Sequence, residues 1–292
     1  MSLRPAPEDR PPADLLSFGV VNLDKPPGPS AHQVAGWVRD MTGQERAAHA
    51  GTLDPKVTGC LPLLLGDATR LAQVFADARK EYVTVLELHG PAPADFDAVV
   101  AEFEGPIYQK PPRKSAVKRE LRTREIYALD VLEREDRRAL LRIECEAGTY
   151  VRKLCHDLGL ALGTGANMGD LRRTRTGRFD DANLVTLHDL ADALAFWADD
   201  GDPEPLREVV QPAERVLEGL PAVTIAPSAA REVAEGAPVY APGVIDGPDA
   251  SEAGDELVAC YTPNGAAVCI GRLVGDPDAE LGTVVELARV LV

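Results

Sequence analysis

Alternating hydrophobic and polar residues predict where the chain forms strands. Leu141, Ile143 and Cys145 alternate with charged residues, a period of two that is typical of a half-buried strand. Short apolar runs predict two further strands, at 18–23 and 82–88. These patterns indicate that part of the chain forms a sheet.

Other segments have helical spacing and recognisable ends. The segment 150–162 reads as a helix that ends at Gly163, and Thr186 with Asp189 resembles a capping box at the start of another. Ser30 can cap a third helix. The apolar positions that we expect on one face of that third helix are Val34, Trp37, Val38 and Met41.

Composition divides the chain into a leader and two domains. Residues 1–17 contain four prolines and mixed charges, which predicts a flexible leader. A segment rich in Pro, Gly and acidic residues marks a boundary, so we expect a first domain at 18–215 and a second at 216–292. In the second, short apolar runs flank Asn264-Gly265, a dipeptide typical of a tight hairpin.

The net charge argues at first against a nucleic-acid partner. The 292 residues carry a formal charge of −16, with a pI near 4.8. The charge is unevenly distributed, however. From residue 181 onward there are 5 basic and 21 acidic residues and no lysine, whereas residues 1–180 hold 26 of each sign. Within the first part, 105–178 has 17 basic and 10 acidic residues. This basic middle is compatible with RNA or another polyanion.

The cysteines and the hydropathy narrow the class of protein. Five cysteines form no CxxC pair, and no secretory signal precedes them, which predicts reduced thiols in a cytoplasmic protein. No apolar run approaches the ~18 residues that span a membrane. His and Cys do not gather at zinc spacing, so we expect no structural metal.

The first candidate for chemistry is Asp54, within the segment HAGTLDPKVTG at 49–59. Two glycines, a proline and two threonines suit a tight loop that holds one carboxylate at a surface. A turn in which the aspartate merely bonds backbone amides is the alternative interpretation.

Two further residues fit a site built around Asp54. Arg152 follows a predicted strand end in GTYVRKL; it is either a solvated surface residue or, if partly buried, a partner for Asp54 that would keep the carboxylate ionised and oriented. Tyr82 begins a strand, where tyrosine usually packs in a core. Facing a cleft, it could instead stack on a base and take part in proton transfer.

Two basic segments are candidates for contact with phosphate. The stretch 109–124 has seven positive residues against one glutamate, and LRRTRTG at 171–177 has three arginines in four residues. Both patterns are also compatible with solvated surfaces. The residues that we expect to bind RNA are Lys110, Arg113, Lys114, Lys118, Arg119, Arg172 and Arg173.

Five motifs together resemble the TruB-type pseudouridine synthases. They are GVVNLDKPPG at 19–28, the HAGTLDPKVTG loop, the Tyr82 strand, GTYVRKL and LRRTRTG, in the family's order and spacing. The DPKVTG form and the run GLALGTGANM resemble the archaeal and eukaryotic dyskerin branch. The second domain has the place and size of that family's PUA domain.

The resemblance implies isomerisation of uridine to pseudouridine in RNA. Asp54 matches the family's catalytic aspartate, Tyr82 the tyrosine that stacks on the target base, and Arg152 the arginine paired with the aspartate. The resemblance also implies pocket or substrate roles for Lys25, His49 and Leu171. The target uridine must leave its stack to reach such a pocket.

The implied fold is an α+β catalytic domain with a mixed, largely antiparallel sheet, followed by a small PUA-like β-barrel. Implied partners are tRNA, rRNA and guide RNA, with small core proteins of a box H/ACA ribonucleoprotein. No cofactor is implied, because the reaction is an internal isomerisation and nucleotide-binding glycine motifs are absent. The resemblance leaves open whether the target is chosen by a guide or is the T-loop uridine of tRNA.

Some features depart from the family pattern. Ala50 replaces a hydroxyl residue, the short leader puts packing of an N-terminal extension on the PUA domain in doubt, and the second domain is unusually acidic. A non-catalytic RNA-binding scaffold is one alternative, and a hydrolase with Asp54 as nucleophile is another. The abundance of acidic residues with scarce lysine also predicts a cytoplasm of high salt, where screening at ~1 M shortens electrostatic range to ~3 Å.

Overall fold

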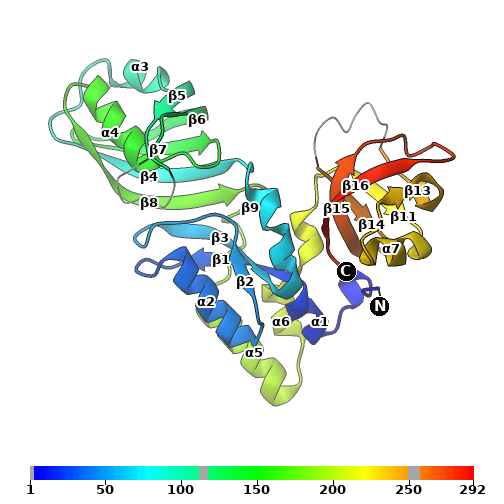
Figure 1. The fold of residues 1–292 in the computed structure, drawn as a ribbon. Coiled ribbons are helices and arrows are strands. Elements are labelled where there is room, and N and C mark those ends of the chain that lie inside the picture. The colour runs from blue at the N-terminus through cyan, green and yellow to red at the C-terminus, as the bar shows by residue number, and fades with distance from the viewer. Residues whose placement is uncertain (1–2, 112–117, 249–256) are drawn as a thin grey trace.

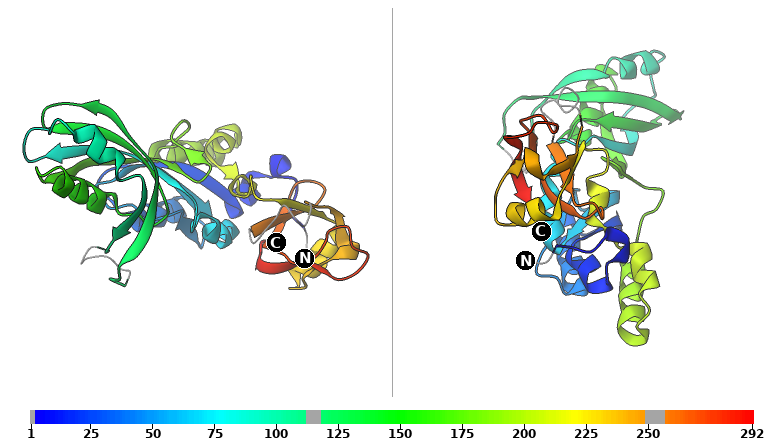
Figure 2. Two further views of the ribbon diagram at one scale, coloured as in Figure 1. Left: turned by 90° about the horizontal axis from the view of Figure 1, so that it is seen from above. Right: turned by 90° about the vertical axis from the view of Figure 1, so that its right-hand side faces the viewer.

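A computed structural model describes residues 3–111, 118–248 and 257–292 and contains two β-sheets (Figure 1). The larger sheet, of ten strands, forms the first domain, and a sheet of six strands forms the second. Seen from above, the two domains lie end to end (Figure 2). The two ends of the chain lie close together, beside the junction between the domains (Figures 1 and 2).

The larger sheet has the strand order β10-β1-β3-β8-β4-β7-β6-β5, with β2 added to β3 and β9 to β8. Its strands are β1 (Gly19–Lys25), β2 (Ala47–His49), β3 (Thr58–Leu65), β4 (Lys80–Leu88), β5 (Gly105–Gln109), β6 (Arg122–Arg134), β7 (Arg138–Cys145), β8 (Ala166–Thr176), β9 (Phe179–Asp180) and β10 (Gln211–Pro212). The β3–β8 pair is parallel and the other pairs are antiparallel. The predicted mixed, largely antiparallel sheet is therefore confirmed.

Helices pack near both ends of this sheet (Figure 1). The helices and 3-10 turns of the first part of the chain are η1 (Pro7–Asp9), α1 (Pro12–Ser17), α2 (Ala31–Thr42), η2 (Gly66–Phe75), α3 (Phe96–Ala101), α4 (Val151–Ala161), α5 (Leu187–Asp200), α6 (Glu204–Val209) and η3 (Ala213–Val216). Helix α4 packs along β8, whereas α2 contacts β2, β3 and α5. The parallel β3–β8 pair thus lies where the two halves of the sheet meet.

Local sequence signals account for several helix ends. Ser30 and Thr186 each form the reciprocal hydrogen bonds of a capping box, with Gln33 and Asp189 respectively. The predicted face of α2 is only partly right, because Trp37 and Met41 are exposed. The buried face of the helix consists instead of Ala31 and Ala35 together with the predicted Val34 and Val38.

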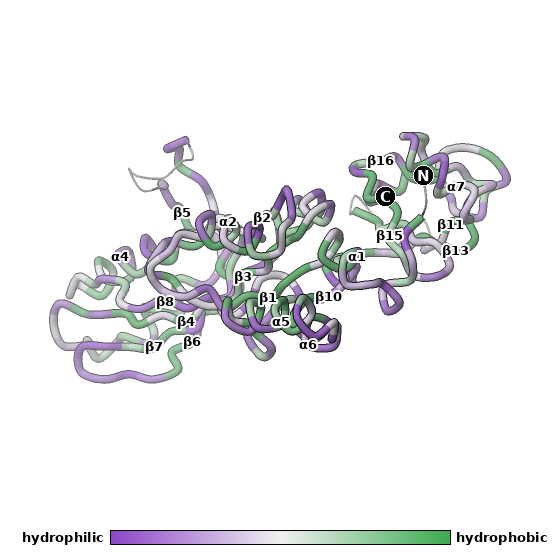
Figure 3. Tube along the Cα trace, turned by 90° about the horizontal axis from the view of Figure 1, so that it is seen from below, coloured by the Kyte–Doolittle hydropathy of each residue, from purple (hydrophilic) through white to green (hydrophobic). Residues whose placement is uncertain are grey.

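The second domain is a barrel-like sheet of order β12-β16-β15-β14-β11-β13. Its elements are β11 (Ala222–Ile225), α7 (Pro227–Ala234), β12 (Val239–Tyr240), η4 (Ala241–Gly243), β13 (Val244–Asp246), β14 (Leu257–Tyr261), β15 (Ala267–Leu273) and β16 (Thr283–Val290). Strands β14 and β15 pair antiparallel around Asn264-Gly265, which confirms the predicted hairpin. Hydrophobic stretches along the strands alternate with hydrophilic connections (Figure 3).

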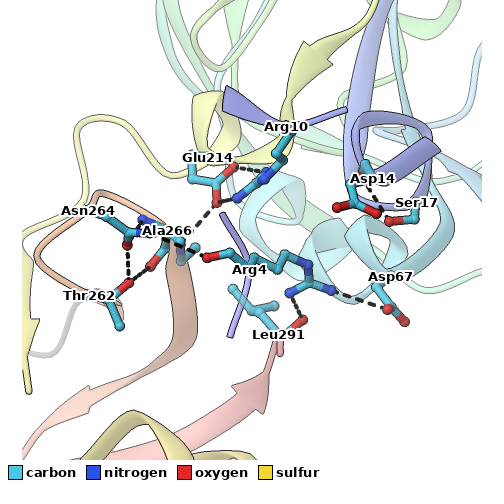
Figure 4. Close-up of polar contacts among 11 residues, drawn as sticks. Arg4, Arg10, Asp14, Ser17, Asp67, Glu214, Thr262, Asn264, Ala266 and Leu291 are labelled. Carbon is cyan, nitrogen blue, oxygen red and sulfur yellow. Dashed lines mark hydrogen bonds and ion pairs between the residues drawn. The ribbon is translucent and has the colours of Figure 1, made fainter. Parts of the chain in front are cut away.

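The leader was expected to be flexible, and the described part of it is packed. Leu15 and Leu16 of α1 are buried in the core of the first domain, and the Arg10 side chain is fully buried. Arg10 forms an ion pair with Glu214 of η3, and Glu214 in turn accepts a hydrogen bond from the Ala267 amide of β15 (Figure 4). The flexible-leader expectation is wrong for these residues because the leucines of α1 pack into the core of the first domain and Arg10 pairs with a residue about two hundred positions away.

One buried cluster joins the two domains. Phe18 and Leu71 of the first domain lie in the same cluster as Ala267, Ile270 and Leu291 of the second. Arg4 adds polar contacts at this junction, donating to the Leu291 carbonyl and, at 3.2 Å, to Asp67 (Figure 4). The leader therefore contacts the second domain, which removes the doubt raised by its short length.

Candidate active site

Asp54 lies at an exposed turn between β2 and β3. Its side chain is 54% exposed, while the neighbouring Leu53 and Val57 are buried in the core of the first domain. The Val57 amide donates to the Asp54 carbonyl at 3.0 Å and closes the turn. The loop therefore presents a carboxylate to solvent, and the buried side chains of Leu53 and Val57 fix its backbone to the core.

Lys25 holds this loop in place. Its ammonium group is fully buried and donates to the carbonyls of Pro26, Pro55 and Val57 at 2.9, 3.0 and 2.7 Å. Burial lowers the pKa of Lys25. The side chain predicted to lie in the pocket therefore braces the Asp54 loop from behind, through backbone carbonyls.

Arg152 and Asp54 form the ion pair predicted from the sequence. Arg152 lies in the first turn of α4, and its side chain is 55% exposed. The pair joins the loop after β2 to the helix after β7, so it connects two segments that follow different strands of the sheet. A half-exposed pair contributes little to stability, so its main physical effect is to orient the carboxylate.

Gln109 fixes the start of the helix that carries Arg152, a contact that sequence reasoning missed. The buried Gln109 side chain accepts from the Tyr150 amide at 2.9 Å and donates to the Tyr150 carbonyl at 3.2 Å. Tyr150 is the N-cap residue of α4 and has no capping bond from its own side chain. An uncharged glutamine next to a basic run gave no sequence signal for this role.

Tyr82 lies on β4 and is almost fully buried. Burial raises the pKa of its phenol, and the charge of the nearby Arg173 opposes that effect. Leu171 on β8 is register partner to Thr84 and packs against the same core as Tyr82 and Leu53. The three predicted residues Asp54, Tyr82 and Leu171 thus lie on elements that share one core.

Arg173 was predicted to bind RNA, but its side chain is buried and cannot contact an RNA backbone. Its side chain is only 1% exposed, and its guanidinium donates to the Cys60 carbonyl at 2.8 Å and to the Gly51 carbonyl at 3.3 Å. The expectation was wrong because the loop that carries Asp54 covers this face of β8, with Gly51 packed against the guanidinium. The run of arginines in the sequence contains no information about that coverage.

Arg172 faces differently and is partly exposed. It binds both carboxylate oxygens of Asp24, at 3.0 and 3.2 Å, and lies 3.6 Å from Asp181. The hydrogen bonds that Arg172 donates to Asp24 raise the pKa of its guanidinium. A phosphate at this position would have to compete with two carboxylates for the same guanidinium.

His49 is half-buried at the end of β2. Burial lowers its pKa, and the charges of Arg173 and His32 lower it further. Its Nδ1 atom is buried and has no hydrogen-bond partner. The ring is therefore held neutral close to the Asp54 loop.

The basic segment at 109–124 connects two antiparallel strands. β5 and β6 pair from Gly105 with Ile126 to Gln109 with Arg122, and β5 is at the edge of the sheet. Lys110, Lys118 and Arg119 are exposed, with Lys118 paired to Glu120 and Arg119 donating to the Pro111 carbonyl at 3.2 Å. The remaining predicted RNA-binding residues, Arg113 and Lys114, lie outside the described residues.

The described part of the chain limits the chemistry available at this site. Among those residues, no three His, Cys, Asp or Glu side chains gather as metal ligands would. No helix there is both long and apolar enough to cross a membrane. The five cysteines are buried and free. What the geometry provides is one oriented, solvent-facing carboxylate beside a guanidinium, on a loop whose Leu53 shares a core with the buried Tyr82.

Comparison with protein-family models finds matches along most of the chain. The matching models are the DKCLD domain at 5–35, the N-terminal domain of TruB family pseudouridylate synthases at 39–94 and 87–151, the C-terminal domain of tRNA pseudouridylate synthase B at 152–218, and the PUA domain at 221–279.

Curated relatives match over nearly their full length. A probable tRNA pseudouridine synthase B of Haloarcula marismortui is 70% identical, over 100% of this chain and 94% of the relative. The protein of the same description from Halobacterium salinarum is 64% identical over the whole of both chains. One from Methanopyrus kandleri is 48% identical over 98% of this chain and 86% of its own.

Solved structures have the same fold. A chain in the crystal structure of a Cbf5-Nop10-Gar1 complex is 45% identical, with a TM-score of 0.91 over 100% of this chain and 90% of that one. A chain from an H/ACA ribonucleoprotein bound to a substrate RNA containing 2′-deoxyuridine is 42% identical, with a TM-score of 0.90 over 99% and 90%.

Proposed function

The chain belongs to the TruB family of pseudouridine synthases, isomerases that act on RNA, and from this premise we propose that Asp54 carries the reaction in this protein. The observation that supports the proposal is the ion pair between the exposed Asp54 carboxylate and Arg152. Conversion of uridine to pseudouridine breaks the N1–C1′ bond, forms a C5–C1′ bond, and moves a proton from C5 to N1. Atoms balance within one nucleotide, so no cofactor is required.

The surrounding residues divide the work around that carboxylate. Arg152 pairs with the Asp54 carboxylate and holds it directed outward. Tyr82 offers a ring on which the extruded base stacks and a phenol that assists proton transfer. Leu171 lines the same pocket with an apolar surface, while His49 helps to hold the flipped nucleotide.

The exposed part of the basic segment is proposed to contact the RNA backbone. Lys110, Lys118 and Arg119 extend from the β5–β6 connection, and the buried Gln109 links the base of that connection to α4, which carries Arg152. Contact with phosphate at this segment would supply salt-dependent affinity without reading sequence. It would also place the RNA next to the helix that orients Asp54.

The substrates are proposed from the relatives. Two of the solved relatives are Cbf5 in a complex with Nop10 and Gar1 and an H/ACA ribonucleoprotein with substrate RNA, while the curated relatives are described as tRNA pseudouridine synthases. We therefore propose both a guided reaction, with small core proteins and a guide RNA, and an unguided reaction at the T-loop uridine of tRNA. Both would use the same Asp54 site, in the cytoplasm of a halophilic archaeon.

Tritium release from RNA labelled at C5 of uridine tests the proposal directly, because the C5 hydrogen is lost only when the C5–C1′ bond forms. The purified chain is assayed in concentrated KCl on a tRNA transcript alone, and on a guided substrate with guide RNA and core proteins. Release on either substrate, with pseudouridine found at the released position, is the expected result. RNA binding without release on both substrates would show a scaffold instead.

A further inference from the structure

Arg173 lies directly beneath the loop that carries Asp54. Its Nε donates to the Cys60 carbonyl on β3 at 2.8 Å, and its Nη2 donates to the Gly51 carbonyl at 3.3 Å. Gly51 is three residues before Asp54 in the chain. One guanidinium therefore links strand β3, at Cys60, to the start of the Asp54 loop, at Gly51.

The buried charge of Arg173 has no anionic partner. Among the described residues, no carboxylate forms an ion pair with its guanidinium. The ionisable groups that face it are cationic or neutral, namely Lys80, His49, Tyr82 and Cys60. Burying an unpaired charge is costly, so a residue chosen for stability alone would be apolar here.

Lys80 is a second buried cation close to Arg173. Burial, and secondarily the charge of Arg173, lowers the pKa of Lys80 to about 8. Its ammonium group donates only to backbone carbonyls, those of Phe75 at 3.0 Å and Ala78 at 2.7 Å. Two cations thus lie side by side behind the Asp54 loop.

Arg173 is also a direct neighbour of the tyrosine of the site. Tyr82 on β4 is the register partner of Arg173 on β8. The charge of Arg173 opposes the rise in phenol pKa that burial causes. Arg173 is therefore a neighbour of Tyr82 in the sheet and is hydrogen-bonded to the Asp54 loop through Gly51.

The backbone of the loop is packed directly against this guanidinium. A Cβ added at Gly51 would lie 3.3 Å from Arg173 Nη1 and 3.7 Å from Lys80 Cε, and Gly51 has a φ of +109°. Only glycine adopts that conformation readily and leaves room for this approach. A shift of the guanidinium would consequently shift either the loop or the phenol.

We propose that Arg173 is a positioning residue that sets the Tyr82 phenol and the Asp54 loop at a fixed distance from each other. This proposal rests on the pseudouridine synthase activity proposed above. The planar fork of arginine directs separate N–H groups at the carbonyls of Cys60 and Gly51 while the residue lies beside Tyr82 in the sheet, which a lysine ammonium on a flexible stem does not reproduce. Misplacement of reacting groups by about 1 Å can lower a rate about 10²-fold.

The test compares Arg173→Lys with Arg142→Lys. Arg142 is a matched control, since its guanidinium binds Asp130 at 3.0 Å on the half-exposed face of β7, away from the loop. Single-turnover rates and RNA affinity are measured for wild type and both variants in concentrated KCl. For Arg173→Lys we expect a rate about 10²-fold lower with affinity within about twofold of wild type. An unchanged rate overturns the proposal.

A double-mutant cycle separates positioning from simple loss of structure. If Arg173 acts through the phenol, Arg173→Lys lowers the rate far less in a Tyr82→Phe background than in wild type. Equal losses in both backgrounds overturn the proposal. A wild-type protein without any turnover refutes the proposed function instead, so the two failures are distinguishable.

A spectroscopic readout needs no activity. With ¹³Cζ-labelled tyrosine, the Tyr82 resonance, assigned by its loss in Tyr82→Phe, shifts in Arg173→Lys and stays in place in Arg142→Lys. If Arg173→Lys does not fold, Gly51→Ala keeps the arginine and places a methyl group 3.3 Å from its Nη1. The same resonance shift and loss of rate are then expected, and their absence overturns the proposal.

Discussion

The Asp54 carboxylate and the Arg152 guanidinium pair across a sequence separation of 98 residues. Both side chains are about half exposed, so water competes for each charge and the pair adds little to the free energy of folding. The pair matters because it orients a carboxylate that faces solvent. Two buried cations hold the loop in place through its backbone: Lys25 donates to the Pro55 carbonyl and Arg173 donates to the Gly51 carbonyl.

Replacing Arg152 with lysine should separate orientation from stability. Lysine keeps the charge and loses the planar fork, so we expect the single-turnover rate to fall about 10²-fold while the free energy of unfolding changes by less than about 1 kcal/mol. Arg142→Lys, which alters a similarly exposed pair with Asp130, should leave both quantities near wild type. An Arg152→Lys protein with a wild-type rate would contradict the role given to this pair.

The buried Arg10–Glu214 pair should behave in the opposite way. Its atoms lie 2.7 and 2.5 Å apart and are shielded from water, so Arg10→Met leaves the Glu214 carboxylate without its cationic partner and should cost about 3–5 kcal/mol in denaturant unfolding. Arg215→Met breaks an exposed pair with Glu218 on the same turn and should cost less than about 1 kcal/mol. Similar losses of unfolding free energy in both variants would show that the Arg10–Glu214 pair stabilises the protein no more than an exposed ion pair does.

Alkaline pH should destabilise the protein through its buried thiols. Burial raises the pKa of Cys60, Cys145 and Cys155 to about 12, from 9.0 in the unfolded chain. Between these values the folded state binds more protons, so stability present below pH 9.0 is lost as the pH rises toward 12, by up to about 1.4 kcal/mol per pH unit for each thiol.

Lys80 acts in the opposite direction over part of that range, because its lowered pKa makes stability rise with pH between about 8 and 10.5. Thermal midpoints measured from pH 8 upward, in wild type and in Cys155→Ala, check the balance. The slope above pH 10.5 should be shallower in the variant. An equal slope in the two proteins would contradict the assignment to thiols.

Salt should stabilise the protein toward molar concentrations. The residues from 181 onward carry 21 acidic and 5 basic side chains, and their mutual repulsion is screened as the Debye length falls to about 3 Å at ~1 M. We expect the thermal midpoint and the rate of pseudouridine formation to rise together with KCl. A protein that is most stable in dilute buffer would contradict this expectation.

Local chemistry explains why parts of the fold were predictable. The capping boxes at Ser30 and Thr186 and the hairpin at Asn264-Gly265 depend on residues within a few positions of each other, so the sequence contains the whole signal. The Asp54–Arg152 contact was predictable for a different reason. A carboxylate on a glycine-rich loop and an arginine at a helix start are complementary wherever the fold brings them together.

The features that were mispredicted depend on distant partners. Arg172 and Arg173 are adjacent in the same basic motif, yet one faces Asp24 and solvent while the other is covered by the loop at Gly51. Arg10 lies in a segment of low hydropathy and is buried against Glu214, far along the chain. Both outcomes depend on segments that are distant in the sequence, so no short motif specifies them.

Pseudouridine formation by Asp54→Asn is the measurement that tests the central claim most directly. The substitution keeps the size of the side chain and removes its charge at an exposed position, so the fold and RNA affinity should remain. In the tritium-release assay, on both the tRNA and the guided substrate, we predict turnover below detection with RNA binding within about twofold of wild type. Turnover retained at the wild-type rate would show that Asp54 does not carry the reaction.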